Sequence, residues 1–436
     1  MTDGPAPLPV TPPPEGDGRP SAGGVLRNSA SIVAAQTLGN VFRTIATFLL
    51  IACMRREDYG AMTLAIAFVD PIRSLAVLGI DAVAIRRAVA DPASLPVVAG
   101  TLLRIRIVLA AVAFAVACGA GWAFRSDAPG GAVAVVCAAI GMLPSAACGP
   151  LEAVFHARQR MKRLVFVPAA ANVAVVVTVV VLWLVRAPFV LFIASQAVGD
   201  LVSAVLTWRL ARRELPSIAG PDSALRCDWA LGRAMLREGL PLAYVNVVVV
   251  LYGRVGFLLL EGPGGEGAAA DLGAASKLVN PILLLGAALS ASVAPYASRL
   301  AAQGALGEFR AFFRKFLVRV FLWLGPAVAV AVLAAPAAVR ALKPEYAEAA
   351  TAFRWLGFGA LAMIVCQVST SCLVGLGQFR AIAVFATLNL VVFLALAVPL
   401  TPRLGAEGVA IATFAMEAMN AVLQATFVLR LLRGRP

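Results

Sequence analysis

Long stretches without a charged residue constrain this chain more than any other feature of its sequence. Five of them are 20 to 25 residues long, at 164–185, 278–298, 320–339, 355–379 and 381–402. A helix needs about 20 apolar residues to cross the hydrocarbon core of a bilayer. Each stretch is therefore long enough to form a transmembrane helix by itself.

The composition agrees with a membrane protein. Hydrophobic residues make up 61% of the 436 residues and charged residues 14%, whereas an average soluble domain has about 25% charged residues. A soluble globule of this length needs a polar surface that so few charges cannot supply. A soluble enzyme is therefore excluded.

Several kinds of functional site are also absent from the sequence. No lysine follows a glycine and precedes serine or threonine, as an ATP-binding Walker A loop requires. The seven cysteines form no C-x-x-C motif and the chain has one histidine, so neither a metal site nor a disulfide framework is indicated. We expect no cofactor.

The segments between and around these stretches complete an all-α arrangement. Residues 1–27 are rich in proline and glycine, which predicts a disordered tail. Twelve transmembrane helices are expected after it, at 31–54, 60–80, 103–124, 131–155, 164–185, 189–212, 238–260, 268–294, 317–340, 349–375, 380–400 and 407–431.

The distribution of arginine and lysine gives an independent test of this count, because cytoplasmic connections carry the basic residues. With the amino terminus inside, cytoplasmic segments collect 25 of the 37 basic residues and outer segments only seven. The outer segment 261–271 is acidic. We therefore expect both termini in the cytoplasm, and the net charge of +14 reflects topology rather than binding to nucleic acid.

The longest internal loop divides the chain into two halves, as in many transporters. The expected organisation is an amino-terminal lobe of six helices at 28–212, a cytoplasmic linker at 213–237, a carboxyl-terminal lobe of six helices at 238–431 and a short tail at 432–436.

Five basic residues remain inside the expected helices: Arg43, Arg73, Arg254, Lys277 and Arg354. Each costs on the order of 3 kcal/mol at the middle of a membrane, so such residues face other helices or a wet cavity. Arg354 lies near a helix end, where its side chain can reach the interface. Arg43, Arg254 and Lys277 have no carboxylate three or four residues away, and unpaired cations in a membrane cavity indicate an anionic ligand such as a phosphate.

Polar residues at helical spacing form stripes on three expected helices. The first helix carries Gln36, Asn40, Arg43 and Thr47, the sixth includes Asp200, and the twelfth includes Glu417. Hydrogen bonding between helices is the more common role of such residues. Asp70 and Arg73 can neutralise each other across Pro71 within one helix, or either can be functional. Asp70, Asp200 and Glu417 are the candidates for ion coupling.

The order of several short motifs resembles that of bacterial polysaccharide transporters, which are flippases of the multidrug/oligosaccharidyl-lipid/polysaccharide (MOP) superfamily. The motifs are DYG at 58–60, DPIR at 70–73, LGID at 78–81, YGRVGFLLLEG at 252–262, LGAASKL at 272–278, APYASRL at 294–300, PEY at 344–346 and GAEGVA at 405–410. The resemblance covers about residues 28–430.

The resemblance implies a two-lobed, MATE-like bundle in the bacterial inner membrane that moves undecaprenyl-diphosphate-linked oligosaccharide by alternating access. The family cavity is built by the first, second, seventh and eighth helices, which here carry Arg43, Arg73, Arg254 and Lys277. With Asn40, these are the expected substrate-binding residues. Asp70 is the only acid expected to be buried there, so the cavity should be net positive. Relatives often have an acid where this chain has Gly253.

Other functions fit less well. A multidrug exporter of the same superfamily would share the fold but prefer an acidic cavity for cationic drugs. A glycan polymerase would need a larger outer loop than this chain has, and the major-facilitator signature is present only in distorted form. Expected partners are the lipid-linked substrate, membrane lipid and the polymerase or export proteins of the same pathway.

Overall fold

The computed structural model describes residues 39–77, 79–91, 94–125, 130–157, 161–214, 226–261, 265–342, 344–346 and 348–433. The expected tail 1–27 and Gln36 lie outside these ranges.

All the described elements are helices. A first helix at Gly39–Cys53 is followed by α2 (Arg56–Leu75), α3 (Ile80–Ala90), α4 (Leu95–Arg125), α5 (Gly131–Ala139), α6 (Met142–Ala157), η2 (Met161–Leu164), α7 (Phe166–Leu184), α8 (Phe189–Glu214), α10 (Trp229–Leu258), α11 (Gly265–Ala302), α12 (Leu306–Leu342), η3 (Pro344–Tyr346), α13 (Ala349–Gly375) and α14 (Phe379–Leu431).

Each of the twelve expected segments overlaps a described helix. Within the described residues, eight helices are long and apolar enough to span a membrane, or nine if the bent α10 is included. The 53-residue α14 contains two of the expected segments, because its backbone leaves the helical region at Gly405 (φ 54°, ψ −129°) and two helices meet there at a kink. The all-α membrane fold predicted from the sequence is confirmed.

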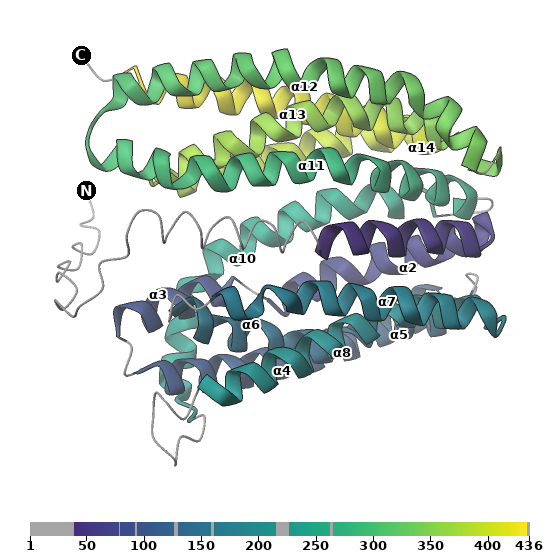
Figure 1. Cartoon of the computed structure of the whole chain (residues 1–436), viewed down its shortest axis with the longest axis horizontal. Coiled ribbons are helices and arrows are strands. Elements are labelled where there is room, and N and C mark those ends of the chain that lie inside the picture. Colours follow the sequence, from purple (N-terminus) through teal and green to yellow (C-terminus); the bar gives the residue numbers. More distant parts are fainter. Residues whose placement is uncertain are drawn as a thin grey trace.

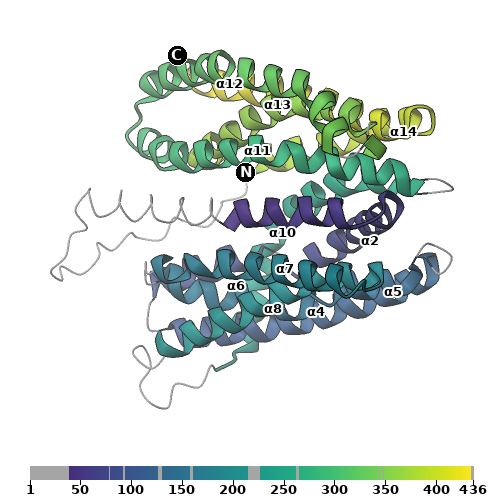
Figure 2. The same cartoon turned by 45° about the vertical axis from the view of Figure 1, so that its right-hand side comes forward.

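The helices form two groups that are visible in Figures 1 and 2. Helices α4 to α8 lie on one side and α11 to α14 on the other, with the first helix, α2 and α10 between them. We call the helices up to α8 the N lobe and those from α10 onward the C lobe. Alanine dominates the largest core cluster, which lies mainly in the C lobe. Small side chains let apolar helices approach closely where lipid removes the hydrophobic driving force.

The two lobes contact each other at one end of the bundle, between α2 and α11. Arg56 at the start of α2 forms an ion pair with the fully buried Asp271 of α11, and also reaches Glu348 at 3.4 Å. An ideal Cβ atom on Gly60 would lie 1.8 Å from the backbone oxygen of Glu266, so only glycine permits this approach. We call this the Arg56 end.

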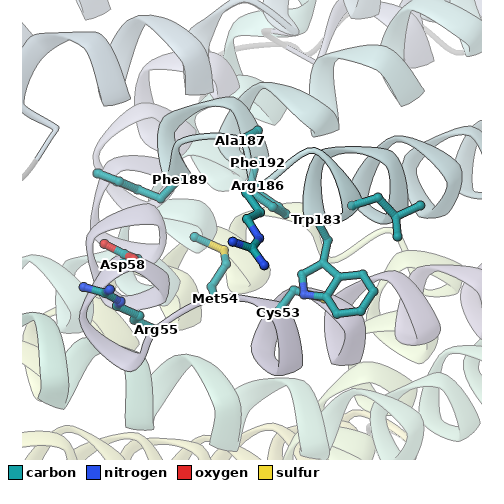
Figure 3. A pocket seen from close by; sticks show the side chains of 10 residues that line it. Cys53, Met54, Arg55, Asp58, Trp183, Arg186, Ala187, Phe189 and Phe192 are labelled. Carbon is teal, nitrogen blue, oxygen red and sulfur yellow. The ribbon is translucent and has the colours of Figure 1, made fainter.

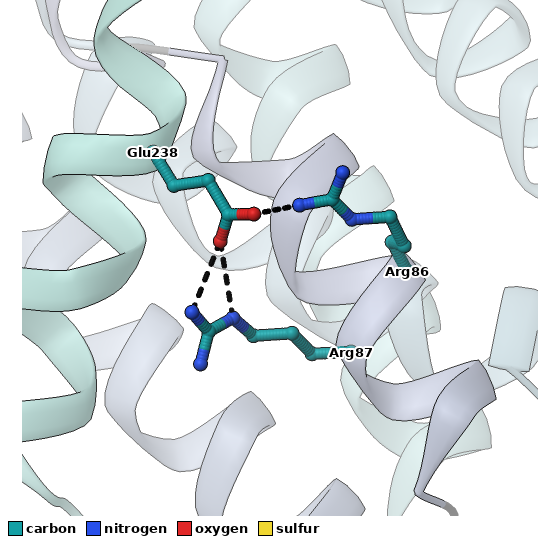
Figure 4. Close-up of polar contacts among 3 residues, drawn as sticks. All are labelled: Arg86, Arg87 and Glu238. Atoms are coloured by element: carbon teal, nitrogen blue, oxygen red, sulfur yellow. Dashed lines mark hydrogen bonds and ion pairs between the residues drawn. The ribbon is translucent and has the colours of Figure 1, made fainter. Parts of the chain in front are cut away.

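A second contact between the lobes lies at the opposite end, the Arg86 end. Arg86 and Arg87 of α3 both bind Glu238 of α10, with Arg87 Nη2 3.0 Å from the carboxylate (Figure 4). The side chain of Asp228 caps α10 by accepting hydrogen bonds from the backbone N–H groups of Ala230 and Leu231. Helix α10 thus begins inside the segment 213–237 that the sequence predicts to be a linker.

Candidate functional site

A cavity between the two lobes brings together most of the predicted site residues. It has a volume of about 310 Å³, and four basic residues and one acid line it: Arg43, Arg73, Arg254, Lys277 and Asp70. An adjoining cavity of about 290 Å³ shares Arg43, Thr47, Lys277 and Asn280 with it and is also lined by Asn40. We call the two together the central cavity.

The polar stripe of the first helix explains why this helix lines the cavity. Asn40, Arg43 and Thr47 follow one another at helical spacing and all face the central cavity. The stripe lies opposite Lys277 and Asn280 of α11, so polar residues from the N and C lobes meet across the cavity. A polar stripe on an apolar helix faces other polar groups because lipid would leave it unsolvated.

Two of the four basic residues have carboxylate partners on other helices. Arg254 of α10 lies 2.7 Å from the carboxylate of Asp70 on α2, and Arg73 of α2 lies 2.9 Å from that of Asp200 on α8. Asp70 and Arg73 therefore do not neutralise each other within α2. Arg254, which the sequence indicates to be unpaired, is neutralised by Asp70.

Arg43 and Lys277 are different. Neither forms an ion pair with any residue in the described part of the chain. The side chain of Arg43 is exposed within the structure and that of Lys277 is half-buried. Both line the two parts of the central cavity, so these two cations are free to bind an anion there.

Glu417 does not line the central cavity. Its side chain is 2% exposed, and it lines an adjoining cavity of about 180 Å³ in the C lobe, which shares Phe257, Ser276 and Asn280 with the central cavity. Farther along the same stripe, Gln424 donates to Asn420 and accepts from Thr370 of α13. Part of the polar stripe on α14 therefore holds α14 against α13 through hydrogen bonds, which is a common role of polar residues in membrane helices.

Three charged contacts were not predicted from the sequence. Among the described residues, Asp70 is the single acid that lines the central cavity. Asp271 is a fully buried acid of α11 in the segment expected to lie outside, and it pairs with Arg56 at the Arg56 end instead of lining the cavity. Glu238 binds Arg86 and Arg87, and Asp81 lies 2.6 Å from the buried Arg106. The acidic segment 261–271 was the only sequence signal for Asp271.

The described residues contain no group of three histidine, cysteine or acidic side chains that could hold a metal ion. None of the seven cysteines, all of which the structure describes, forms a disulfide.

Comparison with known protein families shows to which family the chain belongs. Residues 25–301 match a family described as polysaccharide biosynthesis protein, and this range is more than half of the chain. The chain belongs to this polysaccharide biosynthesis family. The match includes every helix that supplies a charged residue to the central cavity.

Solved structures of low sequence identity share the fold. An inward-facing MATE transporter of the MOP superfamily is 14% identical, with a TM-score of 0.74 over 93% of this chain and 98% of that chain. An outward-facing MATE transporter is also 14% identical, with a TM-score of 0.66 over 93% and 96%. A MOP superfamily transporter from Pyrococcus furiosus, described as having a binding pocket of reversed polarity, is 13% identical, with a TM-score of 0.66 over 94% and 96%. Among curated protein sequences none matches the chain.

This member of the family is thus a multi-pass membrane protein with the fold of MOP superfamily transporters. Its family and fold are those of transporters rather than enzymes. The predicted MATE-like fold is confirmed.

Proposed function

We propose that the protein is a flippase that moves undecaprenyl-diphosphate-linked oligosaccharide across the bacterial inner membrane by alternating access. The oligosaccharide would be a repeat unit of O-antigen, capsule or exopolysaccharide. The observation that carries the proposal is the pair of cations, Arg43 and Lys277, that face the central cavity without an ion-pair partner among the described residues.

The chemistry of the substrate suits this cavity. A diphosphate carries several negative charges, and charge-assisted hydrogen bonds from arginine or lysine bind phosphate strongly. Asn40, Thr47 and Asn280 line the cavity beside the two cations and can hydrogen-bond to sugar hydroxyls. The prenyl chain would remain in the lipid while the polar part passes between the lobes.

The two lobes supply a route for alternating access. They are packed together at the Arg56 end through α2 and α11, and the fold matches an inward-facing transporter with a higher TM-score than an outward-facing one. The distribution of basic residues predicts that the Arg56 end faces outward. Transport then requires the Arg56–Asp271 contact to break.

Export of cationic drugs is the alternative, because solved MATE transporters share the fold. The central cavity argues against it, since four basic side chains and one acidic side chain line it. A cationic drug would be repelled by this excess of positive charge.

The energy source of transport is a separate part of the proposal. Asp70, Asp200 and Glu417 remain the candidates for ion coupling. Asp70 and Asp200 pair with arginines, whereas Glu417 is buried in the C lobe without an ion-pair partner among the described residues. The protein would work with the polymerase and export proteins of its pathway.

The proposal is tested by replacing Arg43 or Lys277 with alanine in a strain that lacks its own flippase. Loss of one charge-assisted contact to a phosphate costs about 1.5–3 kcal/mol, so we expect roughly a tenfold or greater fall in surface glycan for R43A and K277A. Arg354 is a matched control, because it is an exposed arginine within α13 that does not line the central cavity.

R354A should display glycan at the level of the unmodified protein, with membrane levels of all variants measured by immunoblot. Normal display by both R43A and K277A, at normal protein levels, would refute the proposal. Loss of drug resistance in the same two variants, with normal glycan, would favour the multidrug alternative.

A further inference from the structure

A second pocket lies at the Arg56 end, within the N lobe. It has a volume of about 570 Å³ and is formed where the first helix and α7 end and where α2 and α8 begin (Figure 3). Arg55, Asp58, Trp183, Leu184 and Arg186 are among the residues that line it. We call it the Arg186 pocket. It shares no lining residue with the central cavity, so it is a separate site.

The charges of this pocket favour an anion. Arg55 and Arg186 form no ion pair with any residue that the structure describes, and Asp58 is the single acid in the lining. Figure 3 shows Arg186 extending toward Met54 and Trp183, with Arg55 and Asp58 to one side of the pocket. The lining has one more cation than anion, and both guanidinium groups lack an ion-pair partner among the described residues, which suits a phosphate better than a neutral ligand.

The backbone at Arg186 is unusual. Helix α7 ends in a Schellman motif, in which the N–H of Arg186 donates to the oxygen of Trp183 at 3.1 Å and the N–H of Ala187 to that of Leu182 at 2.9 Å. The residue in the left-handed position of this motif is usually glycine. Arg186 has φ 52°, and every other described residue with positive φ is a glycine. Arginine is strained at this position, where glycine would not be. Backbone strain of this kind often occurs at functional residues, which suggests a function for the Arg186 side chain.

The surroundings of the pocket point to a lipid. Trp183 is 54% exposed and Leu184 66% exposed, and both lie at the end of the apolar helix α7. Tryptophan is enriched where the hydrocarbon core meets the headgroups. A ligand in this pocket can therefore place a charged group at Arg186 and an apolar chain against Trp183 and Leu184.

We propose that the Arg186 pocket binds the phosphate headgroup of an anionic phospholipid in the outer leaflet. The two guanidinium groups hold the phosphate, and the acyl chains lie along the lipid-facing side of α7. The proposal does not depend on what the central cavity transports.

Native mass spectrometry of the full-length protein in detergent tests the assignment, with phosphatidylglycerol and phosphatidylcholine as probes. We expect one phosphatidylglycerol molecule to bind roughly tenfold more tightly than phosphatidylcholine. One charge-assisted hydrogen bond increases the affinity by about this factor. R186G and R55Q should each remove most of this preference, and R186K should keep part of it. R403Q, which changes an exposed arginine outside the pocket, should bind as the unmodified protein does.

Thermal unfolding separates loss of binding from loss of folding. Glycine fits the left-handed backbone better than arginine, so R186G should unfold at a higher temperature than the unmodified protein in lipid-free detergent. Added phosphatidylglycerol should raise the unfolding temperature of R186G less than that of the unmodified protein, because a ligand stabilises a folded protein only if it binds it. These opposite changes would not arise from a misfolded variant.

Three results would overturn the proposal. Equal binding of the two phospholipids would show that the headgroup charge is not recognised. Unchanged binding by both R186G and R55Q would place the lipid elsewhere. Displacement of phosphatidylglycerol by geranylgeranyl diphosphate at much lower concentration, but not by inorganic diphosphate, would assign the pocket to a polyprenyl diphosphate instead.

Discussion

At the level of single residues, pairing between helices decides which cations of the central cavity can bind a ligand. Arg254 and Arg73 are held by Asp70 and Asp200 at 2.7 and 2.9 Å, whereas Arg43 and Lys277 remain unpaired within the described residues. The paired arginines stabilise contacts between α2, α8 and α10. The same residue type therefore has two roles in one cavity.

We predict that the Asp70–Arg254 pair stabilises the packing of α2 against α10. D70N or R254Q should each lower the free energy of unfolding by about 1–3 kcal/mol, because each leaves one charged group without its partner. The double variant D70N/R254Q leaves no unpaired charge and should recover most of this loss.

Thermal unfolding of the purified protein in detergent measures these changes. Lys277→Gln is the comparison, because Lys277 has no ion-pair partner in the described residues and its removal should not lower the unfolding temperature. If the double variant loses as much stability as the two single variants together, the two residues do not stabilise each other.

At the level of helices, the contact between α2 and α11 closes the Arg56 end. Gly60 permits this contact, since the backbone oxygen of Glu266 occupies the space that a Cβ atom would need. Thr63 and Tyr59 pack against Gly273 nearby. Small residues at such crossings allow two helices to pack backbone to backbone.

We predict that G60A forces α2 and α11 apart. Overpacking of a tight contact costs about 1–3 kcal/mol, so the unfolding temperature should fall and the lobes should separate at the Arg56 end. Spin labels at the exposed residues Glu57 of α2 and Glu345 of η3 would report this separation as a longer distance by pulsed electron paramagnetic resonance.

The control is G119A, because no atom lies within 4 Å of an ideal Cβ atom on Gly119. Alanine is a better helix former than glycine by about 1 kcal/mol, so G119A should be at least as stable as the unmodified protein. An unchanged distance and unfolding temperature in G60A would show that α2 and α11 are not tightly packed in the membrane.

For the molecule as a whole, alternating access requires the contact at the Arg56 end to open during transport. We predict that a reducible cross-link between cysteines at Arg56 and Asp271 abolishes transport and that its reduction restores it. The measurement is uptake of a lipid diphosphate substrate by proteoliposomes, in a variant whose seven native cysteines are replaced.

A cross-link within one lobe is the control. The hydroxyl groups of Ser290 on α11 and Ser371 on α13 contact each other inside the C lobe. Cross-linked S290C/S371C should transport as its reduced form does, because the lobes move as units. Undiminished transport with the Arg56 end fully cross-linked would contradict alternating access between the lobes.

The places of the apolar helices followed from the sequence, but their ends did not, and eight or nine of the described helices are long and apolar enough to span a membrane. The length of an apolar segment indicates whether it can cross the bilayer, and the arginine residues beside it indicate its direction. Both can be read from a local stretch of the sequence. Helix α10 begins at Trp229 instead of 238, and α11 continues to Ala302. These extensions carry polar residues, so an apolar pattern could not locate them.

The sequence by itself determined which residues are costly in a membrane, because the free energy of placing a charge in hydrocarbon depends on the residue and its segment. Arg43, Arg73, Arg254 and Lys277 were found in this way. Only the tertiary structure decided which of them are neutralised, since Asp70 and Arg254 are far apart in the chain and meet only when α2 packs against α10. Ion pairing acts over a few ångströms, and distances of that size between helices exist only in the folded protein.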